Sequence, residues 1–409
     1  MEPGALIELE VAKPAAGGRM IGRHDGQVVL VWGAIPGERI RARLERVTRA
    51  VAYADTVEVL SASPDRRDTA GDWRCGGSVY AHVHYPRQRQ LKAEILGDAF
   101  ARIARLPIAP PEVVPSPERG YRMRARLHAR GGRLGFFREG THDLCDAVAT
   151  GQLLPQTGDW IARVEEVLAR ERLTGLAWLE LAENVAGDQR ACHFEVAEGE
   201  RRGRYAPLAD LAGREIADTL HAREGDRASA FRLHRDARAF FQGNRFLLEG
   251  LAQLVVSLVP PGPVVDLYAG VGLFGLALAA AGWERVTLVE GDPVSSTDLR
   301  QNAQAFAGRA RVERRSVESF LAAGGGPSDG GGTVIVDPPR TGLSRDALAG
   351  VLRMRPGRLI YVSCDPATLA RDARAAIDGG YALTSLTGLD LFPNTAHVES
   401  VAVFDSAIR

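Results

Sequence analysis

The sequence predicts an α/β protein in three parts: an N-terminal β-barrel, a central α+β region and a C-terminal doubly wound parallel sheet. Three observations support this. Short strand patterns with glycine-rich corners fill residues 4–60, Pro-rich connections follow, and strand and helix patterns alternate from Pro263 onward. A chain of 409 residues is long enough for several domains. We expect three, over residues 1–62, 63–240 and 241–409.

Composition excludes some classes of protein. The 51 Lys and Arg balance the 51 Asp and Glu, so no overall field indicates a nucleic-acid partner. No apolar run approaches the roughly 20 residues that span a bilayer, and the N-terminus lacks a signal-peptide pattern. The four cysteines are scattered, which fits a reducing compartment and not a disulfide framework: Cys75, Cys145, Cys192 and Cys364. We therefore expect a soluble, cytoplasmic protein with no membrane partner.

The N-terminal strand patterns predict a small barrel that could bind an oligonucleotide. Five arginines between Arg39 and Arg49 cluster between two of the strands, although a solvated charged face is the usual alternative. The region resembles the TRAM domain of RNA-modifying enzymes in Gly18, Gly22, Gly26 and the stretch 31–38. The resemblance implies RNA binding.

A basic strand is predicted over residues 121–137. Alternation with a period of two places Arg122, Arg124 and Arg126 on one face and apolar side chains on the other. Between Arg119 and Arg138 there are seven arginines and no acid. Uncompensated positive charge on a flat face is suited to phosphate contacts, so we expect these arginines to bind RNA. A merely solvated sheet face remains the alternative.

A glycine loop with two acids indicates a cofactor site in the C-terminal region. Gly270, Gly272 and Gly275 follow a strand that contains Asp266, and Glu290 comes about 20 residues later, as in dinucleotide-binding folds. An NAD(P)-dependent oxidoreductase is therefore one interpretation. S-adenosylmethionine is the other, because its ribose also needs an acid at the second strand end. Asp266 favours the methyl donor, since a carboxylate can face an ammonium but repels a pyrophosphate.

Two more strand ends carry chemical groups. The turn 337–340 reads Asp-Pro-Pro-Arg, and Cys364 follows an apolar strand pattern just before Pro366, which can open a helix. The thiol therefore lies where open α/β sheets bind ligands, beside a helix N-terminus that is expected to favour the thiolate. A small buried packing residue is the alternative for a lone cysteine. Hydride transfer needs neither a thiol nor a rigid Asp-Pro-Pro turn.

These motifs occur in order with Gln242 before the glycine loop and the stretch 392–399 after Cys364. In this order they closely resemble the RNA uridine C5-methyltransferase family, over most of the chain as far as Phe404. The resemblance implies transfer of a methyl group from S-adenosylmethionine to carbon 5 of a uridine in structured RNA. A thiolate adds to carbon 6 to activate carbon 5, and a base later removes the carbon 5 proton.

By this resemblance Cys364 is the nucleophile and Glu399 the base, with His397 ranked below Glu399. Donor-site residues are Gln242, Asp266, Tyr268, Gly270, Gly272, Glu290 and Asp337, and Arg340 is a further candidate for substrate contact. The expected partner is ribosomal RNA in preference to transfer RNA, bound by a monomer. A non-catalytic RNA-binding protein and a methyltransferase acting on an exocyclic amine remain alternatives.

Many members of the family hold an iron–sulfur cluster with four cysteines. This chain keeps Cys75 of that pattern but has Thr69 and Ser78 at two other positions and no cysteine near Thr150. One thiolate cannot hold such a cluster, so we expect no iron–sulfur cluster and no metal site. Cys145 and Cys192 lie off the pattern and are expected to be packing residues.

Overall fold

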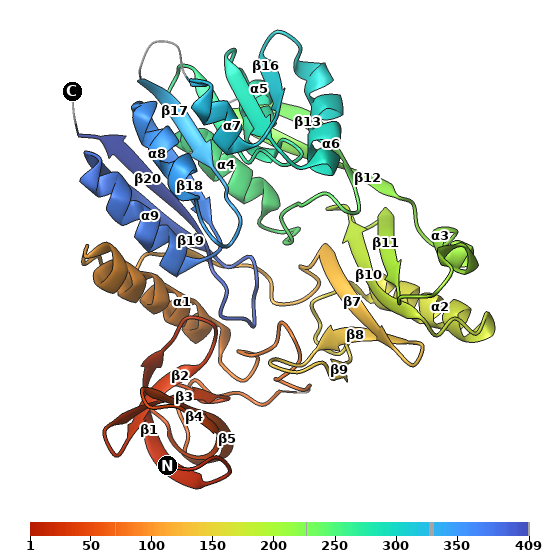
Figure 1. Cartoon of the computed structure of the whole chain (residues 1–409), viewed down its shortest axis with the longest axis vertical. Helices are drawn as coiled ribbons and strands as arrows, with labels where there is room; N and C mark the ends of the chain where they lie inside the picture. Colours follow the sequence, from red (N-terminus) through yellow and green to blue (C-terminus); the bar gives the residue numbers. More distant parts are fainter. Residues whose placement is uncertain (70, 226, 327–330, 408–409) are drawn as a thin grey trace.

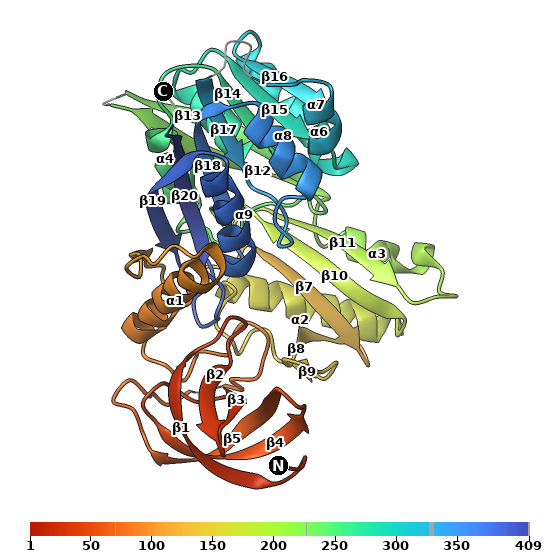
Figure 2. The same cartoon turned by 60° about the vertical axis from the view of Figure 1, so that its left-hand side comes forward.

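The computed structural model describes residues 1–69, 71–225, 227–326 and 331–407. A barrel lies at one end of the molecule and a large sheet at the other, with a smaller sheet beside them (Figure 1). The view in Figure 2 shows helix α1 between the barrel and the large sheet. In the described part of the chain, no helix is long and apolar enough to cross a membrane.

The N-terminal barrel is closed, in the strand order β1-β2-β3-β5-β4. Alternate side chains of β4, such as Ile40 and Leu44, fill its interior. Arg39 and Arg41 on the outer face pair with Glu8 of β1, so part of the arginine cluster is neutralised within the barrel. The strands are β1 (Leu6–Pro14), β2 (Met20–His24), β3 (Gln27–Trp32), β4 (Arg39–Val47) and β5 (Val51–Ser61).

A linker of irregular structure leads from the barrel to α1 (Tyr85–Ala99), which a π-helical turn, η1 (Phe100–Ala104), extends. The helix starts at a proline in its first turn, as expected from the fixed φ of proline. It packs against η1, α9 and the short strand β6 (Val113–Val114), which joins the edge of the large sheet. Residues 85–114 therefore lie against the C-terminal sheet and not within the central one.

The central sheet has the order β11-β10-β7-β8-β9. The predicted period of two is confirmed on the basic strand, because Tyr121, Met123, Ala125 and Leu127 are buried while the arginines between them are not. Helix α2 covers the sheet with an apolar face that includes Trp160. The elements are β7 (Arg124–Arg130), β8 (Arg133–Phe137), β9 (Leu144–Cys145), α2 (Pro155–Arg170), β10 (Leu176–Glu183), β11 (Arg190–Val196), η2 (Arg202–Tyr205) and α3 (Ala206–Ala209).

A two-stranded antiparallel ribbon, β12 (Glu215–Glu224) and β13 (Arg227–Asp236), connects the central sheet to the large one. It packs on α4 (Leu248–Leu258), α5 (Leu273–Ala281) and α6 (Pro293–Ala303), so its apolar side chains belong to the core of the C-terminal region.

The large sheet has the order β16-β15-β14-β17-β18-β20-β19-β6, and its central strands are parallel. The strand order reverses between β14 and β17, which is where such sheets bind ligands at their carboxyl edge. The predicted terminal hairpin is confirmed, with β20 antiparallel between β18 and β19. The remaining bounds are β14 (Val264–Leu267), β15 (Val286–Glu290), η3 (Gln304–Phe306), β16 (Ala310–Arg314), α7 (Val317–Ala322), β17 (Gly331–Val336), α8 (Arg345–Arg353), β18 (Pro356–Ser363), α9 (Pro366–Asp378), β19 (Tyr381–Leu389) and β20 (Glu399–Ser406).

Candidate active site

The glycine loop joins β14 to α5 and is held by Asp266. This residue is fully buried, and its Oδ2 accepts a hydrogen bond from the backbone N–H of Gly275 (2.8 Å), while Oδ1 has no partner among the described residues. Burial raises the pKa of Asp266 to about 8. Gly272 has φ +106°, and a Cβ there would lie 2.5 Å from Leu276 Cδ1, so the loop needs glycine at this position.

The second acid is tied directly to the same loop. Glu290 ends β15, and its Oε2 accepts from Gly270 N–H (2.8 Å) while Oε1 accepts from Asp292 N–H (2.7 Å). Tyr268, between the first acid and the glycines, adopts φ +62°, an uncommon conformation that often marks a functional site. The buried carboxyl group of Asp266, which has one oxygen without a partner among the described residues, and the partly buried Glu290 fit a ligand with an ammonium group and hydroxyls.

Gln242 lies outside the strands of the large sheet and contacts the carboxyl end of β17. It precedes α4, and its Nε2 donates to Asp337 Oδ2 (3.2 Å) at the end of β17. Burial raises the pKa of Asp337 to about 7. The neighbouring Phe240 was not predicted as part of the site, although its side chain is 63% exposed and lies under the Arg124 guanidinium. The sequence signal that could have indicated Phe240 is the pair of consecutive phenylalanines, Phe240 and Phe241, just before Gln242.

Cys364 follows β18 directly, and its environment differs from the predicted one. Asp365 is the N-cap of α9, and its Oδ1 accepts from the N–H groups of Ala367 (3.0 Å) and Thr368 (2.8 Å), so these helix N–H groups bond to a carboxylate and not to the sulfur. Burial, with a smaller contribution from the Glu399 carboxylate, raises the pKa of Cys364 to about 11, and only Arg340 acts in the opposite direction. The expectation that the helix favours the thiolate is therefore wrong for this structure.

Glu399 reaches Cys364 through the antiparallel pairing of β18 with β20. Ser363, the last residue of β18, lies opposite Ser400 in register. Cys364, which follows β18, is therefore beside Glu399, the first residue of β20. Glu399 is 2% exposed, and its Oε1 has no partner among the described residues. Burial and then repulsion from Asp337 raise the pKa of Glu399 well above its usual value, while Arg340 opposes this shift. Three strand ends thus bring a thiol and two carboxyls together.

A cavity of about 430 Å³ is connected to this group of residues by Arg340, which lines the cavity and whose charge acts on Cys364 and Glu399. Cys364, Glu399 and Asp337 do not themselves line it. His397 and Arg340 line it from the C-terminal sheet, and Arg122 and Arg126 line it from the basic strand. Partial desolvation and then the Arg340 charge lower the pKa of His397 to about 4, so its imidazole is neutral near pH 7. The stacked rings of His128 and Phe137, with centroids 3.6 Å apart, form an aromatic part of the wall that was not predicted from the sequence.

The charge on the basic strand is less free than predicted. Glu180 of β10 lies opposite Arg126 in register, and it pairs with both Arg124 (2.9 Å) and Arg126 (3.0 Å). Arg122 instead bonds to the Gln152 amide (2.7 Å) and to a backbone carbonyl. The prediction of uncompensated charge was wrong because the compensating acid comes from a strand more than forty residues later in the chain.

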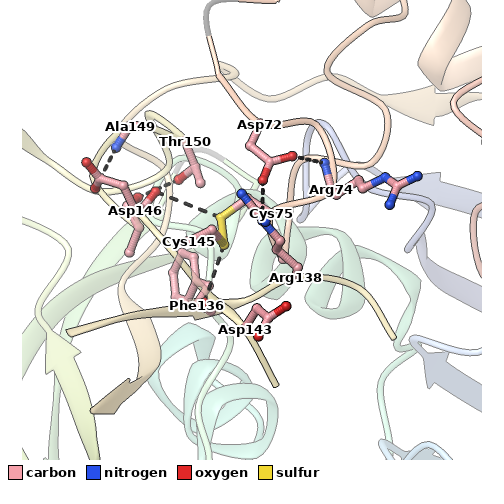
Figure 3. The surroundings of a disulfide bond; sticks show 12 residues. Asp72, Arg74, Cys75, Phe136, Arg138, Asp143, Cys145, Asp146, Ala149 and Thr150 are labelled. Carbon is pink, nitrogen blue, oxygen red and sulfur yellow. Dashed lines mark hydrogen bonds and ion pairs between the residues drawn. A yellow bond between two sulfur atoms is a disulfide. The ribbon is translucent and has the colours of Figure 1, made fainter. Parts of the chain in front are cut away.

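Cys75 and Cys145 form a disulfide with a Cα–Cα distance of 5.6 Å (Figure 3). The predictions of no disulfide and of a packing role for Cys145 were therefore wrong. The cysteines are 70 residues apart, and the backbone of β8 brings them together. Cys75 forms an isolated β-bridge with Arg138, which directly follows β8, and Cys145 lies opposite Phe136 in the β8–β9 pair. Cys192 and Cys364 are free. The residues do not fit an iron–sulfur cluster, because the one pattern cysteine is oxidised and Thr69, Ser78 and Thr150 offer hydroxyls.

The disulfide links the linker to the central sheet, so removing it should destabilise that junction. Cys145→Ser is expected to lower the free energy of unfolding by about 2–4 kcal/mol, because the bond closes a long loop in the unfolded chain. Denaturant unfolding with and without a reductant measures this, and Cys192→Ser is the matched control. Equal stability of the Cys145→Ser variant and the parent, or iron in the purified parent protein, would contradict the assignment.

Comparisons with known proteins agree with this geometry. Models of two families match: the TRAM domain over residues 2–57 and tRNA (uracil-5-)-methyltransferase over residues 330–406. A 23S rRNA (uracil(1939)-C(5))-methyltransferase of Alkalilimnicola ehrlichii is 34% identical, over 98% of this chain and 97% of the relative. An uncharacterized RNA methyltransferase of Streptomyces coelicolor is 31% identical, over 100% of this chain and 95% of the relative. The crystal structure of Pyrococcus abyssi tRNA (uracil-54, C5)-methyltransferase with S-adenosyl-L-homocysteine has a TM-score of 0.74 at 25% identity, and covers 97% of this chain and 99% of that one.

The residues at the carboxyl ends of β14 and β15, which are Asp266, the glycine loop and Glu290, are called the donor edge. The fold, the donor edge and these similarities define a class I S-adenosylmethionine-dependent methyltransferase with an N-terminal TRAM barrel. The chain belongs to the RNA uracil C5-methyltransferase family. The oxidoreductase interpretation of the glycine loop has no support among these similar proteins.

Proposed function

We propose that this protein methylates carbon 5 of a uridine in ribosomal RNA, with Cys364 as nucleophile and Glu399 as base. The observation that carries the proposal is the meeting of Cys364, Glu399 and Asp337 at one sheet edge, beside a cavity lined with arginines. A thiol and a buried carboxyl side by side are what this reaction requires. Methylation of an exocyclic amine has no use for the thiol.

In the proposed reaction, the Cys364 thiol gives its proton to water, the sulfur bonds to carbon 6, and the electron pair of the carbon 5–carbon 6 double bond moves toward carbon 5. S-adenosylmethionine, held by Asp266, Tyr268, Gln242, Asp337, Glu290 and the glycine loop, supplies the methyl group when it is bound. Glu399 then takes the proton from carbon 5, and the carbon–sulfur bond breaks to restore the ring. Burial favours the protonated forms of Cys364 and Glu399. The positive charge of Arg340 opposes this shift and favours the thiolate and the carboxylate that the reaction needs.

Ribosomal RNA is proposed as the substrate because curated relatives from Alkalilimnicola ehrlichii and Pseudomonas putida are named for 23S rRNA. Transfer RNA is the second candidate, supported by the name of the Pyrococcus abyssi structure. A buried site implies that the uridine leaves its stack to reach Cys364, and the exposed Phe240 ring beside the site offers a surface for a displaced base. We propose a monomer acting in the cytoplasm.

Methyl incorporation from labelled S-adenosylmethionine into ribosomal and transfer RNA from cells lacking this protein tests the proposed activity. Mapping 5-methyluridine in the product identifies the nucleotide. No incorporation into either RNA would favour the non-catalytic RNA-binding alternative, and binding of a nicotinamide dinucleotide in place of the methyl donor would favour the oxidoreductase.

RNA affinity should fall with salt, and the cavity arginines should carry part of that dependence. For Arg122→Gln and Arg340→Gln, we expect the slope of log affinity against log salt to decrease by about 0.7–0.9 for each RNA phosphate that the variant no longer neutralises. Filter binding or fluorescence anisotropy between low and moderate salt measures the slope. Arg374→Gln is the control, because Arg374 of α9 is half-buried, pairs with Asp378 and does not line the cavity. Unchanged slopes in both cavity variants would place the RNA phosphates elsewhere.

A further inference from the structure

We propose that Gln88 and Lys92 of α1 are positioning residues for the base Glu399. They act through the loop 390–398, which joins β19 to β20 and so ends at Glu399. In Figures 1 and 2 this loop extends below the large sheet toward the linker, next to α1. The inference rests on the proposed role of Glu399 and adds residues from a helix outside the catalytic sheet.

Both side chains lie on one face of α1, since they are four residues apart, and both are completely buried. Lys92 Nζ donates to Asp390 Oδ1 (2.5 Å) and to the Phe392 carbonyl (3.0 Å). Gln88 Nε2 donates to Asn394 Oδ1 (2.9 Å), and Gln88 Oε1 accepts from Asn394 N–H (2.8 Å). The helix thus holds the loop at three alternate residues.

The held residues connect directly to the base at both ends of the loop. Asp390 follows Leu389, which is the register partner of Glu399 in the β19–β20 pair. From the other end, Thr395 Oγ1 donates to the Phe392 carbonyl (2.7 Å) and accepts from His397 N–H (3.1 Å), two residues before Glu399. A continuous set of hydrogen bonds therefore runs from Lys92 through Phe392 and Thr395 to His397, two residues before the base.

Asn394 shows how closely the loop conformation is specified. Its φ is +64°, in the left-handed region, its Oδ1 also accepts from Arg67 (2.9 Å), and its carbonyl accepts from Tyr80 N–H (2.8 Å). A fully buried ion pair such as Lys92–Asp390 often adds little net stability over apolar residues of equal size. A net gain in stability therefore does not explain the buried pair Lys92–Asp390 or the Gln88–Asn394 contact. Both instead fix the conformation of the loop 390–398.

Glu399 itself makes few interactions that could fix it. Its Oε1 has no partner among the described residues, so its position follows from the backbone on either side. A displacement of about 1 Å in a catalytic group can cost on the order of 100-fold in rate. Loosening the loop should therefore slow the step that needs Glu399 more than it slows substrate binding.

The test compares Gln88→Met with the paired change Lys92→Met/Asp390→Asn, in which no buried charge is left alone. We expect kcat to fall roughly 10–100-fold with KM for RNA little changed. We also expect a larger fraction of denaturation-resistant protein–RNA adduct during turnover, because proton removal becomes slower than addition. Val164→Ala in the core of the central sheet is the control for general destabilisation.

In the control Val164→Ala, any fall in kcat should come without adduct accumulation. The same pattern in the α1 variants would overturn the proposal. If one of the two α1 variants fails to fold, the other one decides. Comparison with Glu399→Gln separates the positioning role from the role of the base. If Glu399→Gln accumulates adduct and the α1 variants do not, only the positioning role fails. If Glu399→Gln accumulates none, the assignment of the base fails with it.

Discussion

Cys364→Ala should reduce methyl transfer to RNA by at least about 1,000-fold, because carbon 5 of uracil is a poor nucleophile until a thiolate has added to carbon 6. The change removes a partly buried sulfur at a strand end and leaves the donor edge on β14 and β15 intact. RNA and donor affinities should stay within a few-fold of the parent. Incorporation of labelled methyl groups, together with equilibrium binding of each ligand, measures both quantities.

Cys192→Ala is the matched control, since Cys192 is the other free cysteine and lies in the central sheet away from the cavity. It should methylate RNA at the parental rate. Full product formation by Cys364→Ala would refute covalent catalysis and, with it, the proposed mechanism. Equal loss in both variants would indicate a general effect of thiol removal on folding.

Glu399→Gln should accumulate a covalent protein–RNA adduct that survives denaturation, with turnover reduced by at least about 100-fold. The amide keeps the shape of the buried side chain but cannot accept the carbon 5 proton, so the carbon–sulfur bond cannot break. Electrophoresis under denaturing conditions with labelled RNA measures the adduct. It should be absent when Cys364 is also replaced by alanine.

His397→Gln separates the two candidate bases. The imidazole of His397 is neutral near pH 7, since its pKa is lowered to about 4, and it lines the same cavity. We expect His397→Gln to turn over without trapping an adduct. The reverse pattern, with an adduct in His397→Gln and normal turnover in Glu399→Gln, would transfer the role of base to His397.

Local patterns predicted much of the fold correctly. The alternation of buried and exposed residues from Tyr121 to Leu127 follows from the period of two that any half-buried strand imposes. The N-terminal barrel was predicted from short strands at regular spacing with glycine-rich corners, and the structure confirms it. The position of Cys364 followed from an apolar run that Pro366 ends. The roles of Cys364, Glu399 and the donor-edge residues stay predictions.

Errors arose where a partner comes from a distant part of the chain or from a neighbouring side chain that competes for the same groups. Glu180 pairs with Arg124 and Arg126 of the basic strand, Asp365 takes the helix N–H groups expected to favour the thiolate, and Cys145 meets Cys75 across β8. The buried contacts of Gln88 and Lys92 with the loop 390–398 span about 300 residues and left no local pattern.

The sequence alone determined the strand and helix periods, the glycine turn and the order of the reactive groups, because these depend on backbone preferences and on neighbours within a few residues. Only the tertiary structure decided that the pKa values of Cys364 and Glu399 are raised, how much charge on the basic strand is unpaired, and that Cys75 is in a disulfide. Each of these depends on burial and on which charges or thiols lie within a few ångströms, and chain folding brings such groups together irrespective of their separation in sequence.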